Sequence, residues 1–303
     1  MNSGSSDGQV VNGRQLGNRQ RQRSVQLREL TWQEIEPLAG PETVVILPTA
    51  AVEQHGRHLP LEVDARIVEE VSHRAAERVI DRVPVLVAPV LWCGVSGYHM
   101  GFAGTMTLSM NTFIQVVEEL GESLVHHGFQ RILILNSHGG NHDPIKIAAR
   151  NIADRSGVAV AAASYWNMAA DDFVDIQDVE VDAVPGHACG FETAMMMALR
   201  PEMVREDAMG AGTPDVSSRG PYFTKRLRRE PLVHLPQQAG VVSAHGWAAD
   251  PTKGTREKGE KYLELVVQRL AHFLEEFAAS DPIPATFAYQ FDPQTARAGV
   301  VRT

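Results

Sequence analysis

The chain has 303 residues, 44% of them hydrophobic and 21% charged, which is the composition of a globular protein with enough apolar side chains for a core. No apolar run approaches the roughly 18 residues that a membrane span needs, and the net charge of −9 argues against a nucleic-acid partner. The only cysteines, Cys93 and Cys189, are too few for a disulfide framework, which indicates a reducing compartment, the cytoplasm.

The two ends of the chain lack helical or strand periodicity. Residues 1–28 are mostly polar and basic without the apolar stretch of a secretory signal, and we predict disordered tails at 1–28 and 281–303. Residues 29–280 contain no repeat and no Pro/Gly-rich linker, so they are predicted to form one domain. The basic run "KRLRRE" (225–230) is interpreted as a solvated surface segment.

Between the tails, short apolar runs alternate with helical patterns. Strands are predicted over residues 43–52, 83–92, 131–136 and 158–166. Helices are predicted over residues 64–80, 109–128, 143–157, 190–204 (as far as Pro201) and 252–280. This alternation predicts an α/β fold with a mostly parallel sheet covered on both faces, in which ligands bind beyond the carboxyl ends of the strands.

Potential metal ligands follow the predicted strands. The first strand leads into Glu53 and His55, with Asp64 at the start of the next helix. His138 follows the third strand, and Glu192 opens the helix that begins at residue 190. Each of these residues taken singly is ordinarily structural, but their recurrence at one sheet edge indicates a site. Two imidazoles and three carboxylates suit Zn²⁺, Mn²⁺ or Fe²⁺ better than Cu⁺ or Ca²⁺.

Three carboxylates in one small space repel one another unless cations offset their charge. A pair of divalent ions bridged by Asp64, each with one Glu and one His, would neutralise the set. The pair would also lower the pKa of a shared water toward about 7. We therefore predict two divalent ions per subunit, Zn²⁺ together with Zn²⁺, Mn²⁺ or Fe²⁺.

Other interpretations of these segments fit less well. The glycine pair in "NSHGGNHD" (136–143) is typical of a phosphate-binding loop, but the Lys and Ser/Thr of a P-loop are missing. A serine hydrolase would need a G-x-S-x-G turn. The remaining histidines are predicted to surround the ligands or to lie at the surface, and they are His58, His99, His126, His127 and His142. Met195 to Met197 are predicted to pack in the core.

Five motifs resemble those of the creatininase (creatinine amidohydrolase) family, and the resemblance covers about residues 40–275. They are "EQHGRHLPLEVD" (53–64), "YHMGFAGTMTLS" (98–109), "LNSHGGNHD" (135–143), "GHACGFET" (186–193) and "DPTKGTREKG" (250–259). The resemblance implies a three-layer αβα sandwich, two divalent ions and often a homohexamer. Family members open the ring of creatinine, remove a formyl group from a formamidopyrimidine intermediate, or trim the mycofactocin precursor peptide.

Carried over residue by residue, the resemblance implies a role for each candidate. Glu53 and His138 would bind one metal, His55 and Glu192 the other, and Asp64 would bridge both. In creatininase itself the carboxylate equivalent to Glu192 comes from two positions after the third-strand histidine, where this chain has Gly140.

The resemblance also implies residues that act on the substrate. His187 matches a catalytic histidine and would protonate the leaving nitrogen, with Glu192 also counted as catalytic. Trp166 and His99 are expected to shape the substrate pocket. "HACGFET", with Cys189, stands where much of the family has "HAGE-x-ET", and this departure leaves the substrate open.

The expected function is metal-dependent hydrolysis of a non-standard or cyclic amide C–N bond by a hydroxide that bridges two metals. The alternatives are a formamide deformylase or a mycofactocin-type precursor peptidase with the same dinuclear site, and a metal-stabilised subunit without turnover. The expected partners are a small-molecule amide or a short peptide, and further copies of the chain in a homo-oligomer such as a hexamer.

Overall fold

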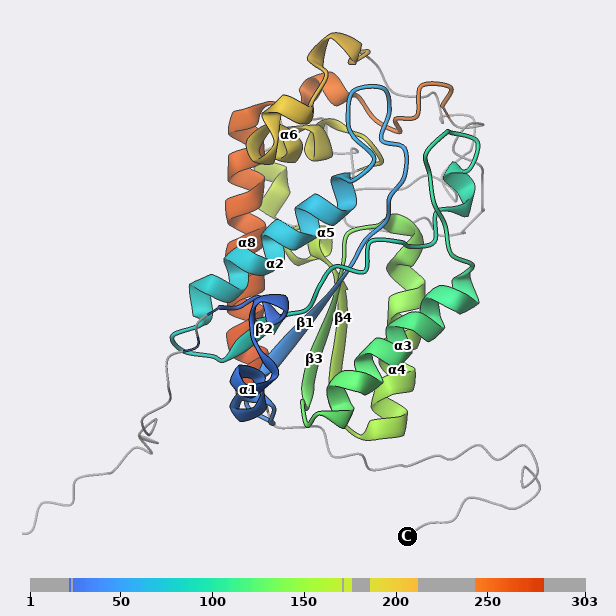
Figure 1. Ribbon diagram of the computed structural model, residues 1–303. Coiled ribbons are helices and arrows are strands. Elements are labelled where there is room, and N and C mark those ends of the chain that lie inside the picture. The colour runs from blue at the N-terminus through green and yellow to red at the C-terminus, as the bar shows by residue number, and fades with distance from the viewer. Residues whose placement is uncertain (1–21, 23, 171, 176–185, 212–242, 281–303) are drawn as a thin grey trace, which may run out of the picture.

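The computed structural model describes residue 22 and residues 24–170, 172–175, 186–211 and 243–280, and it has three layers (Figure 1). The middle layer is a parallel sheet in the order β2 (Val85–Val87), β1 (Val44–Thr49), β3 (Arg131–Asn136), β4 (Ala159–Ser164). Helices α2 (Val63–Val79), α6 (Gly190–Leu199) and α8 (Arg256–Ala279) lie on one side. Helices α3 (Met110–His126) and α4 (His142–Ser156) lie on the other, which confirms the predicted three-layer αβα sandwich.

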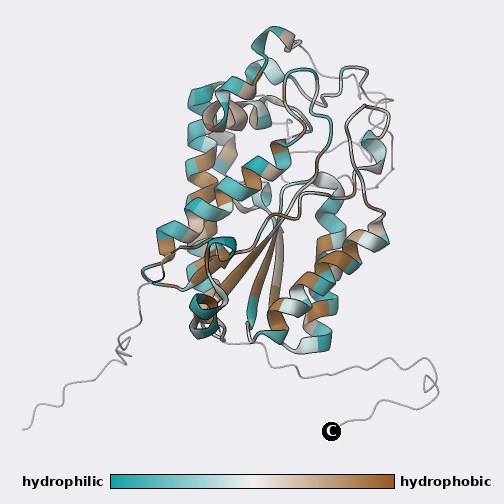
Figure 2. Ribbon diagram, viewed as in Figure 1, coloured by the Kyte–Doolittle hydropathy of each residue, from teal (hydrophilic) through white to brown (hydrophobic). Residues whose placement is uncertain are grey.

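The strands are apolar throughout because both faces of the sheet are covered. Ile46, Leu133 and Leu135 pack in the cluster that includes α2 and α8, whereas Ile132 and Ile134 pack with α3 and α4. Figure 2 shows hydrophobic strands between helices whose inner faces are hydrophobic and whose outer faces are hydrophilic. The period-two alternation along β3 therefore divides one strand between two cores.

The predicted elements are all present, and the differences lie at their ends. The strand predicted over 83–92 ends at Val87 because Pro89 lacks the N–H that a ladder needs, and pairing resumes only as a bridge at Leu91. Helix α8 starts at Arg256 rather than 252, since the Thr255 side chain accepts the N–H of Lys258 and caps it there. The strand predicted through residue 166 ends earlier, and helix α5 (Tyr165–Met168) follows it directly.

Packing begins before the predicted start of the domain at residue 29. Val25 is buried, and its carbonyl accepts the N–H of Val87. The short helix α1 (Trp32–Ile35) follows, and its Ile35 packs against the cluster that contains Val45 and Leu86. Most of the two predicted tails, and the basic run at 225–230, lie outside the described residues.

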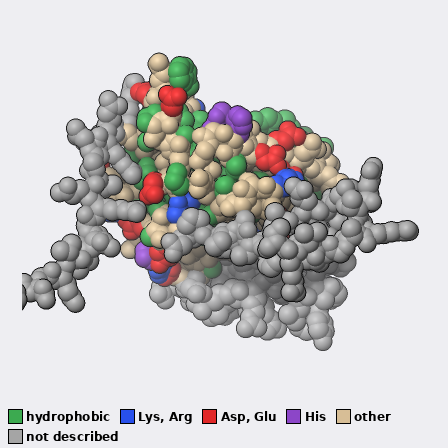
Figure 3. Space-filling model, turned by 90° about the horizontal axis from the view of Figure 1, so that it is seen from below, with side chains coloured by type: hydrophobic (Ala, Val, Ile, Leu, Met, Phe, Trp, Pro, Cys, Tyr) green, Lys and Arg blue, Asp and Glu red, His purple; other side chains and the backbone are tan. Residues whose placement is uncertain are grey.

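None of the described helices combines the length and the apolar character that crossing a bilayer requires. On the face seen in Figure 3, the acidic and basic side chains of the described residues are interspersed, without a single-sign patch.

Candidate metal centre

The predicted ligands converge beyond the carboxyl ends of the strands. Glu53 and His55 lie on the extended segment after β1, and Asp64 lies in the first turn of α2. His138 follows β3, and Glu192 lies in the first turn of α6. Glu53, His55, Asp64 and His138 are at most 2% exposed, and the partly buried Glu192 lies at the side of this cluster, near His55.

The two oxygens of Asp64 face two different groups of potential ligands, Glu53 with His138 and His55 with Glu192. His138 Nδ1 lies 3.2 Å from Glu53 Oε1 and 3.3 Å from Asp64 Oδ2. His55 Nε2 lies 3.3 Å from Asp64 Oδ1 and 3.8 Å from Glu192 Oε2. Ligands held about 2.1 Å from a tetrahedral zinc ion lie roughly 3.4 Å apart. In each set the ligand atoms therefore lie close enough together that they could hold one ion.

Several of these atoms are buried without a hydrogen bond. Glu53 Oε2, His55 Nε2 and Asp64 Oδ2 have no hydrogen-bond partner among the described residues. Leaving such an atom unsatisfied costs about 1–3 kcal/mol. Three of them in one cluster fit a site whose missing partners are cations.

Backbone carbonyls set the orientation of both imidazoles. His55 Nδ1 lies 3.1 Å from the main-chain oxygen of Glu53, and His138 Nε2 lies 3.0 Å from that of Val95. A carbonyl can only accept, so each of these nitrogens carries the hydrogen. The other nitrogen of each ring then presents its lone pair to the carboxylates, which is the arrangement that metal-binding histidines require.

Without a cation the cluster holds protons instead. Burial acts to lower the pKa of His55, but the carboxylate of Asp64, with Glu192 and Glu53, outweighs it and raises the pKa to about 9. Burial also opposes protonation of His138, yet Glu53 raises its pKa well above the usual value. Burial raises the pKa of Glu192 to about 7. Cations and protons therefore compete for these groups.

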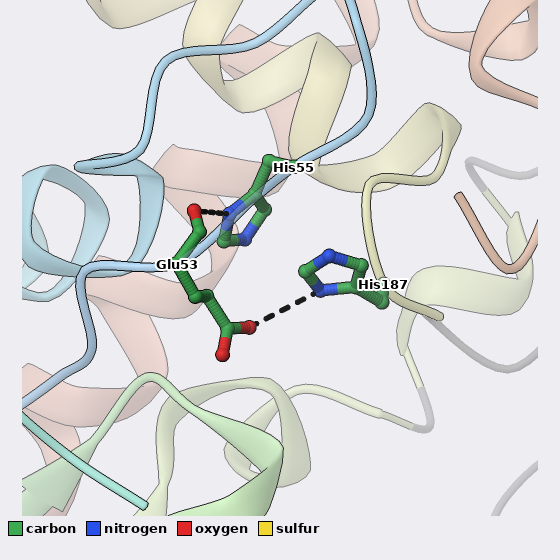
Figure 4. A group of neighbouring side chains, drawn as sticks. All are labelled: Glu53, His55 and His187. Carbon is green, nitrogen blue, oxygen red and sulfur yellow. Dashed lines mark hydrogen bonds and ion pairs between the residues drawn. The ribbon is translucent and has the colours of Figure 1, made fainter. Parts of the chain in front are cut away.

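Two more histidines face Glu53. His187 Nδ1 and His99 Nε2 each lie 3.3 Å from Glu53 Oε1, and Figure 4 shows the imidazole of His187 beside this carboxylate and the ring of His55. Burial lowers the pKa of His187 well below its usual value, and the neighbouring His55 adds to this effect. A neutral ring with a free nitrogen at this place can accept a proton.

A strained turn holds Glu192. Among the described residues, Ala188 is the one non-glycine residue with a positive φ, at 50°. Its N–H donates to Glu192 Oε2 over 2.6 Å. Helix α6 also packs closely against α8, where a Cβ at Gly259 would collide with the carbonyl of Ala194. The turn and the helix contact together fix how far Glu192 reaches into the cluster.

Gly140 leaves no room for a ligand of its own. A Cβ there would collide with the carbonyl of Val95 and would lie 2.6 Å from His138 Nε2. The carboxylate that the resemblance assigns to this position in creatininase therefore has no counterpart here. In this chain Glu192 approaches the His55 side from α6.

Other candidates lie farther from the cluster. Trp166 lies in α5 rather than at a strand end, packs against the core and meets the ring of Tyr165 edge-on at 5.3 Å. Its place in a substrate pocket stays a prediction. His58 Nε2 lies 2.9 Å from Thr193 Oγ1, next to Glu192 in sequence.

Sequence reasoning missed Gln54, whose side chain lies 2.9 Å from both His99 Nδ1 and His187 Nε2. The residue between Glu53 and His55 points away from them on an ideal extended chain. The only signal was a third polar residue in a row directly after a buried strand.

Comparisons with known proteins identify the family of this chain. Residues 28–274 match the family model described as creatininase, creatinine amidohydrolase. A creatinine amidohydrolase of Pseudomonas putida is 32% identical over 84% of this chain and 97% of its own. A mycofactocin precursor peptide peptidase of Mycolicibacterium smegmatis is 31% identical over 74% of this chain and 81% of its own.

Solved creatininase structures have the same fold. A mutant creatininase of the zinc–zinc type and a manganese creatininase match with TM-scores of 0.70 and 0.69. Each is 30% identical, and each match covers 85% of this chain and 100% of the other. The chain belongs to the creatininase family.

Proposed function

We propose that this creatininase-family hydrolase cleaves a non-standard amide C–N bond in a small molecule or a short peptide, with two divalent cations in the cluster. Glu53 and His138 would hold one ion, His55 and Glu192 the other, and Asp64 both. The observation that carries the proposal is the position of Asp64 between two imidazoles. Its Oδ1 lies 3.3 Å from His55 Nε2, and its Oδ2 lies 3.3 Å from His138 Nδ1.

The bound ions would polarise the amide carbonyl and lower the pKa of a water between them. The chain's own residues would then manage the protons. Burial lowers the pKa of His187 and its Nδ1 faces the cluster, so this nitrogen would accept a proton from the attacking water and deliver it to the departing nitrogen. This shuttle refines the simpler expectation of a general acid, since a ring with so low a pKa first needs to gain a proton.

The test is metal content measured together with turnover. We expect about two divalent ions per chain and hydrolysis that is lost on chelation and regained with Zn²⁺ or Mn²⁺. Glu53→Gln should lose metal and activity together. Glu119→Gln, on the exposed side of α3, is the matched control and should lose neither. Full metal content and full turnover in Glu53→Gln would contradict the proposal.

The substrate class is decided by a three-way screen. Creatinine, N-formyl amines and short peptides represent the activities of the family, and the P. putida and M. smegmatis relatives are named for the first and the last. The lack of a side chain at Gly140 favours a substrate other than creatinine, because that side of the site differs from creatininase as the resemblance describes it.

A homo-oligomer in the cytoplasm is the setting we propose, and light scattering of the purified protein tests the assembly.

A further inference from the structure

Gln54 lies between Glu53 and His55, is 4% exposed, and has a side-chain amide that is hydrogen-bonded at both ends. Its Oε1 accepts the N–H of Gly56 over 2.9 Å, and its Nε2 donates to the carbonyl of Gly246 over 3.0 Å. A main-chain N–H can only donate and a carbonyl can only accept. These two partners therefore fix which end of the amide is nitrogen.

The second hydrogen of the amide is directed at His99. Gln54 Nε2 lies 2.9 Å from His99 Nδ1, which must then accept, so the neutral ring carries its hydrogen on Nε2. Its Nε2 lies 3.3 Å from Glu53 Oε1 and has no hydrogen-bond partner among the described residues. His99 therefore presents an N–H to the carboxylate.

The main chain of Gln54 orients a second ring in the opposite sense. His187 Nε2 lies 2.6 Å from the main-chain oxygen of Gln54, so this nitrogen carries the hydrogen and Nδ1 is free. Gln54 Nε2 is also 2.9 Å from His187 Nε2, but both of its hydrogens already have acceptors. The rings of His99 and His187 lie 4.2 Å apart, and both face Glu53 Oε1.

We propose that Gln54 is a positioning residue that fixes the tautomers of His99 and His187, so that one ring offers a hydrogen and the other a lone pair at the same oxygen of Glu53. His99 thereby places an N–H beside Glu53 Oε1, the same oxygen that faces His138 Nδ1. His187 thereby keeps the free nitrogen that a proton shuttle needs. The inference deepens the proposed function and rests on it for the role of the two rings, but the tautomers are measurable without turnover.

The direct test is nuclear magnetic resonance of the zinc-loaded, full-length protein with ¹⁵N-labelled histidine. Two-bond ¹H–¹⁵N correlations identify which ring nitrogen carries the hydrogen, and we expect Nε2 in both His99 and His187. In Gln54→Glu an acceptor replaces the amide N–H₂, so His99 should move its hydrogen to Nδ1. His187 should keep its tautomer, because the main-chain carbonyl is unchanged. Zinc affinity and kcat/KM should each fall by about 10- to 100-fold.

A second variant covers the case in which Gln54→Glu does not fold. Gly246 has φ +86°, and a Cβ there would collide with Gln54 Oε1. Gly246→Ala should therefore displace the amide without changing any group that faces Glu53, and His99 should populate both tautomers. The control is Thr105→Val, which removes only the acceptor of the Gln54 main-chain N–H, at 3.1 Å. It should leave both tautomers and the zinc affinity unchanged.

The outcomes separate the inference from the proposed function. If His99 keeps its wild-type tautomer in both Gln54→Glu and Gly246→Ala, or if Thr105→Val shifts it equally, the inference is wrong even when hydrolysis is observed. If the tautomer shifts as expected but no amide substrate is turned over, the positioning role stands and the proposed hydrolysis does not.

Discussion

Charged side chains are buried at both ends of the parallel strands, but their hydrogen-bonding groups find partners in different ways. At the amino end of β3, Arg131 is 7% exposed, and its guanidinium donates to three main-chain carbonyls, those of Pro41, Phe277 and Ser280. At the carboxyl edge, Glu53, His55 and Asp64 keep buried atoms without hydrogen bonds among the described residues. Burying a charge is tolerated only when partners compensate it. At the amino end the backbone supplies those partners, whereas at the carboxyl end we propose that bound cations supply them.

The largest effect should come from Asp64→Asn, which removes the charge shared by both groups. Loss of several kcal/mol of transition-state stabilisation corresponds to a fall in kcat/KM of about 10³-fold or more. Metal analysis should show that both ions bind more weakly, since Asp64 faces both His55 and His138. Loss of one ion alone would show that Asp64 belongs to a single group and would overturn the bridging role.

Arg131→Met should have the opposite profile, a loss of stability without a loss of metal or activity. It leaves three carbonyls without their donor and should lower the free energy of unfolding by about 3 kcal/mol in urea titrations, while metal content and kcat/KM stay unchanged. Arg131→Lys, which keeps the charge but not the planar fork, is the matched comparison and should recover only part of the loss. A change in metal content in either variant would show that the two edges are coupled.

Removal of the metal should destabilise the folded protein, because protons then have to satisfy the cluster. One ion at a free concentration of about 100 times its Kd contributes about 2.7 kcal/mol, so the loss of each ion should lower Tm by roughly 5–10 °C. Calorimetry before and after chelation measures it. In Asp64→Asn the same treatment should change Tm much less, and an equal fall there would mean that the chelator acts elsewhere.

The smallest effect should come from pH and His58. Burial lowers the pKa of His58 to about 4, against 6.5 for the unfolded residue, so the unfolded chain binds the additional proton between these values. Its contribution to stability is present above pH 6.5 and is lost as the pH falls toward 4, by about 2 kcal/mol between pH 7.5 and pH 5. Unfolding titrations should show a shallower acid loss in His58→Gln, and equal slopes would contradict this.

Much of the fold follows from patterns that one sequence displays. The αβα order and the convergence of Glu53, His55, Asp64 and His138 were predictable, because apolar strands alternate with helices and polar residues follow the strand ends. The end of β2 at Val87 was not predicted, because Pro89 lies inside an otherwise uniform apolar run.

The arrangement around the ligands was beyond sequence reasoning. The interactions of Gln54 depend on Gly246 and His187, which are distant in sequence and reach the site only through the path of loops and of α6. Trp166 was placed at a strand end, whereas β4 stops at Ser164 and α5 begins at once. Such features depend on three-dimensional contacts that no periodicity encodes.

A Cβ at Gly259 would collide with the Ala194 carbonyl, so under our proposal the absence of a side chain at 259 should influence cation affinity, although α8 supplies no ligand. Any larger residue at 259 would push α6 outward and withdraw the Glu192 carboxylate, which α6 carries. Engineering of metal preference in this scaffold can therefore begin at the contact between α6 and α8, where side chains of increasing size at residue 259 would move Glu192 by increasing amounts.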